Sequence, residues 1–309
     1  MKNFYKNGLS GLVPAENQKD TLWIAVENPT LEDRNFLLNE LQIPESFYND
    51  IEDIDERPRI EEENGWNLII MRIPFKNNDS KLPFTTVPLG IVFNKDYFVS
   101  LCFHKTELLE DFVAYTQRKS IGIKNQYDLV LKLLLSSSIW YLKYLKQINQ
   151  RIKLAEDNLE KSIKNEELQA LLELEKCLVF FITSIKGNDI LFHRLKNNKT
   201  EREHFDPDLL EDVDIELKQA QEMSNIYSNI LSGMMDAYAS VISNNLNVIM
   251  KRLTSISIIL MIPTLIASLY GMNVPNALEN NPNGLAIIIL VSGVLAIIGA
   301  LLFKKKNLF

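Results

Sequence analysis

A regular line of small and polar side chains marks the last third of the sequence. Its positions alternate four and three residues apart: Asp236, Ser240, Ser243, Asn247, Met250, Thr254, Ser257, Met261, Thr264 and Ser268. A repeat of about 3.5 residues is the spacing that helices present to one another around a common axis. The hydroxyl, amide and carboxylate groups on this line could bind neighbouring helices or face water.

Two interpretations of this line compete. In the first, small side chains let membrane helices pack closely and hydrogen-bond to one another. In the second, several copies of the helix surround a water-filled pore and the line faces that pore. Asp236 favours the pore, because its copies would form a ring of carboxylates. The line also leads toward Asn273, the residue that follows the apolar run.

The line continues into the first of two apolar segments. These segments cover residues 253–270 and 284–303, and Glu279 is the only charged residue between Arg252 and Lys304. Each segment is close to the roughly 20 residues that a helix needs to cross a bilayer. A buried core helix could explain one such segment, but two in succession predict transmembrane helices. Because two spans cannot enclose a pathway, a pore would require several subunits.

Basic residues predict the orientation of these spans. Lys251 and Arg252 precede the first span and three lysines at 304–306 follow the second, whereas the loop 271–283 contains neither Lys nor Arg. By the positive-inside rule, both termini face the cytoplasm and the loop faces outward. The N-terminal residues lack the apolar core of a signal peptide. We therefore expect a multi-pass protein of the cell (inner) membrane.

The part before the membrane predicts an α/β domain followed by long helices. Segments 21–26, 66–73, 89–94 and 97–103 are rich in β-branched and aromatic residues, which are typical of strands. Thr30 is a candidate N-cap for a helix over 30–41. From about residue 126 onward Pro and Gly become rare, so helices are expected. The pair Asp206-Pro207 predicts a helix start.

Because the next proline is Pro263, one stalk helix could continue from this start into the first span. The predicted order is a cytoplasmic α/β domain (1–125), an antiparallel helix pair (126–205), a stalk helix continuing as the first span (206–270), an outer loop (271–283), the second span (284–303) and a basic cytoplasmic tail (304–309).

Composition excludes several other classes. The net charge is −7, which argues against a general nucleic-acid binder. Cys102 and Cys177 are far apart and have no zinc or redox spacing. We find no phosphate-binding glycine loop and no nucleophile-and-base set, so an enzyme is not expected.

The motif Tyr-Gly-Met-Asn at 270–273, directly after the first span, resembles the CorA family of magnesium channels. Supporting matches are "LWIAVENPT" (22–30), "NDIEDIDERPRIE" (49–61) and "GMMDAYASVISNNLNVIMKRLT" (233–254). The resemblance implies a funnel-shaped homopentamer whose first span lines the pore and whose second span packs outside. It also implies a selectivity filter at Gly271, Met272 and Asn273. The Asn273 amides would hydrogen-bond the water shell of Mg²⁺, which gives up its waters reluctantly.

The resemblance also assigns the pore positions. Asp236 lies on the same line as the implied pore-lining residues, which are Asn247, Met250, Leu253 or Thr254, Ser257, Met261, Thr264 and Ser268. Met250, Leu253 and Met261 would form a hydrophobic constriction that gates the channel. Ser268 departs from the family, because many relatives have Gly there. Glu279, repeated around the outer mouth, would raise the local cation concentration.

A regulatory Mg²⁺ site is implied in the cytoplasmic part. The family's pair of regulatory acids falls on Asp50 and Asp212, and the neighbouring acids are Glu52, Asp53, Glu211 and Asp214. Mg²⁺ bound between subunits, usually through water, would hold the channel closed. The alternative interpretation of these acidic runs is a solvated surface.

The expected function is therefore a magnesium channel, with Mg²⁺ as both cargo and regulator and the lipid bilayer as its surroundings. One alternative is a Co²⁺, Ni²⁺ or Zn²⁺ transporter of the same superfamily. The lack of His and Cys on the line disfavours tight transition-metal sites. Another alternative is a non-conducting membrane-anchored sensor, which the polar line disfavours.

Overall fold

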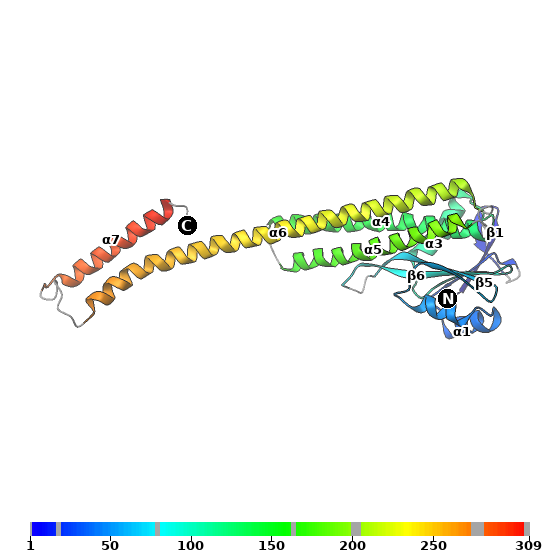
Figure 1. Ribbon diagram of the computed structural model, residues 1–309, viewed down its shortest axis with the longest axis horizontal. Helices are drawn as coiled ribbons and strands as arrows, with labels where there is room; N and C mark the ends of the chain where they lie inside the picture. The colour runs from blue at the N-terminus through cyan, green and yellow to red at the C-terminus, as the bar shows by residue number, and fades with distance from the viewer. Residues whose placement is uncertain are drawn as a thin grey trace. The chain divides into compact units, whose positions relative to one another are not determined.

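The computed structural model describes residues 2–16, 20–77, 81–161, 165–198, 205–272 and 281–305. The chain divides into two compact units, Met1–Gly233 and Met234–Phe309. The first unit is an α/β structure with long helices, and the described part of the second unit is mainly helical (Figure 1). This confirms the predicted fold class.

A seven-stranded sheet organises the first unit. Its strands are β1 Lys2–Gly8, β2 Gly11–Pro14, β3 Trp23–Glu27, β4 Arg59–Glu63, β5 Trp66–Lys76, β6 Phe84–Phe93 and β7 Phe98–Cys102. The spatial order is β2-β1-β3-β7-β6-β5-β4. The β3–β7 pair is parallel and the other neighbouring pairs are antiparallel. The central strands are buried, so their sequences are almost continuously apolar.

Short helices cover one side of the sheet. They are α1 Leu31–Asn35, the π-helix η2 Phe36–Glu40 and α2 Glu45–Glu52. Phe47, Tyr48 and Ile51 of α2 enter a core with Leu68 and Ile70 of β5. A side chain on Gly90 of β6 would collide with Ile51. Glycine at position 90 therefore lets α2 lie close to the sheet.

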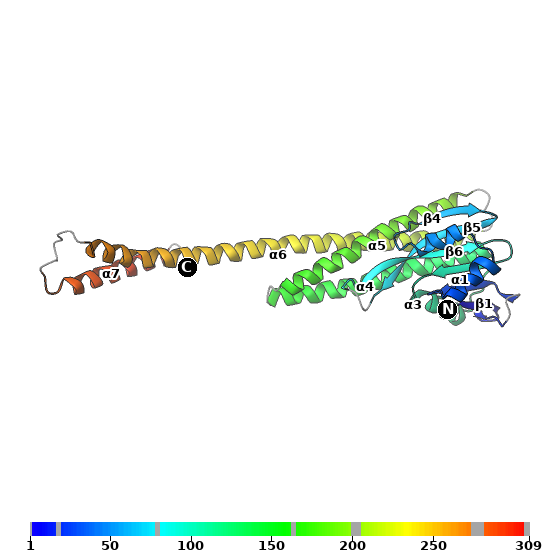
Figure 2. The same ribbon diagram turned by 90° about the horizontal axis from the view of Figure 1, so that it is seen from below.

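Long helices cover the other side of the sheet (Figures 1 and 2). They are α4 Gln126–Lys161 and α5 Asn165–Asn197, and α3 Glu107–Lys119 packs against β2 and α4. The side chains that α5 buries recur at spacings of three and four: Leu171, Leu174, Leu178, Phe181, Ile185, Asn188, Phe192 and Leu195. This is the amphipathic pattern of a helix that packs along one stripe.

One helix, α6, runs from Pro207 to Tyr270 without a break and contains 64 residues. At 1.5 Å per residue it is about 96 Å long. Asp206 caps its start, because Oδ1 of Asp206 accepts a hydrogen bond from the Asp208 amide at 3.2 Å. Within the first unit α6 buries a seam with spacings of four and three: Val213, Leu217, Ala220, Ser224, Tyr227 and Leu231.

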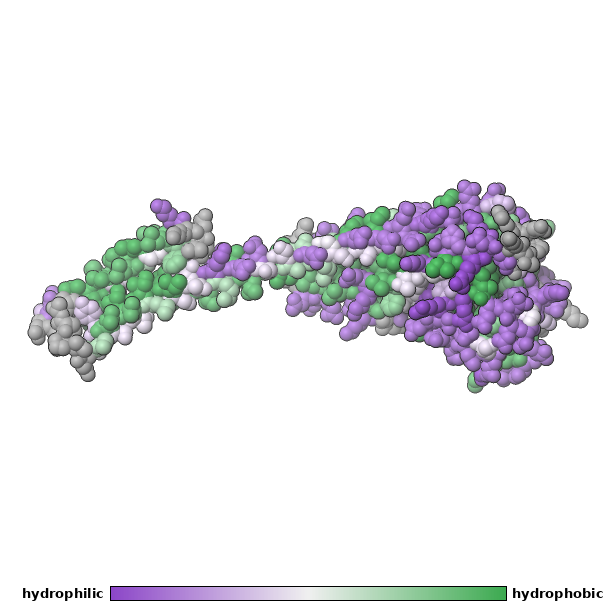
Figure 3. Space-filling view, in the orientation of Figure 1, coloured by the Kyte–Doolittle hydropathy of each residue, from purple (hydrophilic) through white to green (hydrophobic). Residues whose placement is uncertain are grey.

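The second unit contains the rest of α6 and the helix α7, Gly284–Lys305. By length and composition, both helices could cross a membrane. Apolar side chains cover most of α7 and much of the part of α6 that precedes Tyr270 (Figure 3). A polypeptide cannot leave so much apolar surface in water, so this unit requires a lipid or protein environment.

Candidate ion pathway and regulatory site

The helix α7 packs against one face of α6 within the second unit. Ser255 on this face is 3% exposed. A Cβ atom built on Gly299 of α7 would lie 3.3 Å from Cδ1 of Ile262 and 4.0 Å from Cγ1 of Ile259. The absence of a side chain at Gly299 therefore lets the two helices approach, as small residues do in membrane helix pairs.

The predicted line of polar residues lies on the opposite face of α6. Each residue advances a helix by about 100°. On that scale Ser257, Met261 and Thr264 point roughly 180° away from Ser255, Ile259 and Ile262. The line is exposed in the single chain. The contact with α7 thus leaves the polar face of α6 uncovered in the single chain.

A groove of about 570 Å³ follows this face. It is lined by Ser257, Ile258, Leu260, Met261, Ile262, Thr264, Leu265 and Ser268, which include four predicted pore residues. The Ser257 hydroxyl donates to the Leu253 carbonyl at 3.0 Å, and the Thr264 hydroxyl donates to the Leu260 carbonyl at 2.9 Å. Because each hydroxyl proton is used inside the helix, the hydroxyl oxygen remains as an acceptor. Acceptor oxygens suit the water shell of a cation.

The predicted constriction residues are also exposed in the single chain. Met250, Leu253 and Met261 are 51%, 57% and 66% exposed. Asp236, Asn247 and Thr254 are exposed as well. The gating role of these side chains remains a prediction.

Two residues of the predicted filter lie at the end of α6. The Gly271 amide donates to the Ala267 carbonyl at 2.9 Å, and Met272 is 55% exposed. Asn273 and Glu279 lie outside the described residues. The filter itself therefore remains a prediction.

Asp50, a predicted regulatory residue, lies on α2 next to a cation of its own chain. Its Oδ2 accepts a hydrogen bond from Nη2 of Arg59 at 2.7 Å. Burial raises the pKa of the Asp50 carboxyl above its ordinary value, and the Arg59 guanidinium partly opposes this shift. Arg59 also forms ion pairs with Glu56 and Glu61.

The acidic segment after α2 is anchored to the rest of the unit. Nη1 of Arg72 donates to the carbonyls of Ile54 at 2.7 Å and Glu56 at 2.9 Å. Pro58 packs against Gly187 of α5, where an added Cβ would lie 2.8 Å from Pro58 Cγ. These contacts fix the backbone that carries the acids.

Asp212, the second predicted regulatory residue, lies elsewhere in the unit. It is exposed near the start of α6 and lines a pocket of about 260 Å³ together with Tyr115, Ile139 and Trp140. No hydrogen bond or ion pair joins Asp50 to Asp212 within the described parts of the chain. α2 lies on the opposite side of the sheet from the long helices (Figure 1).

A further group of possible metal ligands combines Asp189 and His193 of α5 with Asp214 of α6. One ligand atom from each lies within 4.8 Å of the others. Nε2 of His193 is 3.6 Å from Oδ1 of Asp189, and Oδ2 of Asp214 accepts a hydrogen bond from Lys218 at 2.9 Å. Our sequence reasoning missed the His193 pairing, although the spacing of four between Asp189 and His193 could have indicated it.

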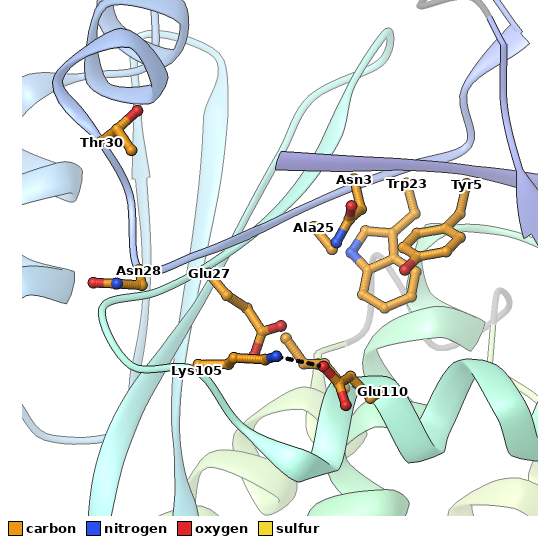
Figure 4. Close-up of a pocket in the computed structure, with 10 residues that line it drawn as sticks. Asn3, Tyr5, Trp23, Ala25, Glu27, Asn28, Thr30, Lys105 and Glu110 are labelled. Atoms are coloured by element: carbon orange, nitrogen blue, oxygen red, sulfur yellow. Dashed lines mark ion pairs between the residues drawn. The ribbon is translucent and has the colours of Figure 1, made fainter. Parts of the chain in front are cut away.

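A separate pocket of about 330 Å³ lies where β1, β3 and the start of α3 meet (Figure 4). Oε1 of Glu27 accepts hydrogen bonds from the amide and hydroxyl of Thr106 at 2.8 and 2.9 Å. Lys105 forms an ion pair with Glu110 at 3.1 Å. Both carboxylates thus have partners in their own chain. None of the residues that line this pocket belongs to the predicted pathway.

Together, these features define a membrane protein with a large α/β unit and two C-terminal apolar helices. The chain belongs to the CorA-like family of Mg²⁺ transporters, because the model of the CorA-like Mg²⁺ transporter protein matches residues 18–305. The members of this family are transporters and not enzymes.

Individual relatives agree with this assignment. The chain is 27% identical to the cobalt/magnesium transport protein CorA of Methanocaldococcus jannaschii, over 93% of this chain and 90% of that protein. It is also 27% identical to the cobalt/magnesium transport protein CorA of Thermotoga maritima, over 84% and 74% of the two chains. The complete structure of the M. jannaschii magnesium transporter matches with a TM-score of 0.82 and 24% identity, and covers 100% of this chain and 99% of that one.

Proposed function

We propose that this chain is one subunit of a homopentameric channel that conducts hydrated Mg²⁺ across the cell (inner) membrane. The observation that carries the proposal is the position of the polar line on the face of α6 opposite α7. Copies of α6 would turn this face toward a shared axis, and α7 would lie outside. Both termini would face the cytoplasm, as the basic residues predict.

The pore would recognise the ion through its water. Hydroxyl oxygens of Ser257 and Thr264 and the amide oxygen of Asn247 can accept hydrogen bonds from coordinated water. Asn273 would form the neutral filter with Gly271 and Met272, and a neutral ring would release the ion more readily than a carboxylate ring. Glu279 at the outer mouth and Asp236 on the inner part of the line would raise the local cation concentration.

Asp50 and Asp212 would form the regulatory site between subunits. The two residues lie on different layers of one chain, which supports a site that needs a neighbouring copy. Without Mg²⁺ the carboxylates would repel each other, and with Mg²⁺ a hydrated ion would bridge them. A high internal Mg²⁺ concentration would then favour the closed state.

Ion flux into vesicles tests the proposed pore. The purified protein is reconstituted with a Mg²⁺-sensitive dye inside, and Asn273→Ala is compared with Asn276→Ala, an amide of the same loop. We expect Asn273→Ala to abolish selective Mg²⁺ uptake and the control to retain it. Wild-type uptake by Asn273→Ala would remove this residue from the filter.

The same vesicles test the main alternative, which is transport of Co²⁺, Ni²⁺ or Zn²⁺. Both relatives are named as cobalt/magnesium transport proteins. The line lacks His and Cys, so we expect Co²⁺ and Ni²⁺ to pass only as weakly held hydrated ions. Zn²⁺ flux that saturates at micromolar Zn²⁺ and is not inhibited by excess Mg²⁺ would favour the alternative.

A further inference from the structure

We infer that the guanidinium of Arg59 competes with Mg²⁺ for Asp50 and thereby sets the Mg²⁺ concentration at which the channel closes. This inference rests on the proposed function, because it takes Asp50 as a regulatory ligand. It assigns to Arg59 the role of a positioned cation that the ion must displace.

The geometry places one cation among three carboxylates. Nη2 of Arg59 lies 2.7 Å from Oδ2 of Asp50, and Nε lies 3.1 Å from Oε2 of Glu61. Nη1 forms an ion pair with Oε1 of Glu56. The side chains of Arg59 and Asp50 are 28% and 32% exposed. The pair is therefore accessible to an ion from solution.

The carboxylates are held in place before any ion arrives. Ile51 fixes α2 against the sheet at Gly90, and Arg72 holds the backbone of Ile54 and Glu56. The Asp55 amide also donates to Oδ1 of Asp53 at 3.0 Å. Binding of Mg²⁺ would thus require little ordering of the segment. The main change at Asp50 would then be the replacement of the Arg59 guanidinium by Mg²⁺.

Arg59 and Mg²⁺ make competing demands on Asp50. The guanidinium donates directly to Oδ2, whereas a hydrated Mg²⁺ needs the carboxylate oxygens free to accept from its water or to coordinate it. Mutual repulsion between the two cations also weakens binding while Arg59 remains in place. Glu56 and Glu61 continue to hold Arg59 when it leaves Asp50, so the exchange is reversible and the arginine stays nearby.

The test is the Mg²⁺ dependence of closure in patches or vesicles. Arg59→Gln should lower the half-closing internal Mg²⁺ concentration by about fivefold, a size that reflects a partly exposed and screened ion pair. Arg59→Lys should give a smaller shift in the same direction, because lysine keeps the charge but lacks the planar fork. Arg34→Gln is the matched control, since Arg34 forms an exposed ion pair with Glu45 at 2.7 Å. We expect it to leave closure unchanged.

Two further variants separate this inference from the proposed function. If Asp50→Asn leaves closure by Mg²⁺ intact, the proposed regulatory site is wrong. If Asp50→Asn weakens closure but Arg59→Gln raises the half-closing concentration or leaves it unchanged, Arg59 does not compete and the inference is overturned. In the double variant Arg59→Gln/Asp50→Asn, the effect of removing Arg59 should disappear. Thermal unfolding in EDTA checks that each variant is folded. If Arg59→Gln does not fold, the shift in half-closing concentration of Arg59→Lys tests the inference instead.

Discussion

Glu27 and Asp50 show how differently two carboxylates of one unit are stabilised. Burial raises the pKa of both carboxyls. Glu27 is supported by two hydrogen bonds from Thr106, whereas Asp50 is supported by the positive charge of Arg59. Neutral donors satisfy the carboxylate oxygens without cancelling the charge, whereas a cationic partner can be exchanged for another cation. At the residue scale, this difference makes Asp50 the better candidate for regulation.

Glu27→Gln should increase stability at neutral pH. Because the folded-state pKa of Glu27 is raised above 4.5, the unfolded chain loses this proton first. Stability therefore falls as the pH rises from 4.5 through the folded-state pKa. The glutamine carbonyl can still accept both Thr106 hydrogen bonds. We expect unfolding temperatures to agree near pH 4 and the variant to be more stable at about pH 8. A variant less stable at every pH would contradict this.

Asp212→Lys should weaken closure by internal Mg²⁺. The substitution replaces a carboxylate with a cation that repels the ion, so the proposed Mg²⁺ bridge to Asp50 of a neighbouring subunit would not form. Patch recordings at high internal Mg²⁺ should then show persistent current. The matched control is Asp208→Lys, because Asp208 lies on the same helix in its first turn. Unchanged block in Asp212→Lys would count against the regulatory role.

Among the helices and strands, α6 stands out because it carries two heptad lines. The buried seam of the first unit ends at Leu231. Continuing its alternation of threes and fours reaches Ser255, Ile259 and Ile262, the face that contacts α7. Continuing the polar line backward from Asp236 in the same way reaches Asp212. Thus the proposed regulatory acid and the proposed pore residues share one heptad register. They would lie on one face only where α6 is supercoiled, because a straight helix drifts by about 20° per heptad.

Changing the register of α6 tests this shared line. Insertion of one alanine between Gly233 and Met234 rotates everything beyond it by about 100°. We expect conduction to persist, because both spans stay together, but closure by Mg²⁺ to be lost. A seven-residue insertion at the same point is the control, since it restores the register to within about 20°. Equal closure in both variants would show that the register does not matter.

Gly90→Ala should destabilise the contact between α2 and the sheet. The added methyl group collides with Ile51, which is 1% exposed, so we expect a loss of about 1–3 kcal/mol in the free energy of unfolding. Gly233→Ala is the control, because an added Cβ there meets no atom within 4 Å. That variant should gain up to about 1 kcal/mol from helix propensity. Thermal unfolding of the full chain in detergent measures both effects.

At the scale of the whole molecule, a single chain supplies only one wall of the proposed pathway. The polar line is exposed and the groove beside it has a wall on one helix only. Copies of the chain could supply the other walls, and a neighbour could bring Asp212 to Asp50. The number of copies comes from the resemblance to the CorA family, which implies a pentamer, so we expect native mass spectrometry of the detergent-purified protein to show five copies. A stable monomer or dimer that still conducts would contradict this assembly.

The sequence by itself determined the features that depend on local periodicity and composition. The two apolar spans, the unbroken helix after Asp206 and the strands β3, β5, β6 and β7 all follow from such patterns. Thr30 also forms the predicted cap of α1, although the predicted helix continues as the π-helix η2. The hairpin β1–β2 was not predicted, because its polar and partly exposed strands give a weak pattern.

Only the tertiary structure decided which groups meet across the sequence. The sequence contains Asp50 and Arg59, but their 2.7 Å contact depends on how α2 and β4 are placed around the sheet edge. The same holds for Glu27 with Thr106, for Gly299 with Ile262, and for the placement of Asp50 and Asp212 on different layers. The physical reason is that periodicity depends on the geometry of one helix or strand, whereas these contacts depend on the packing of several elements at once.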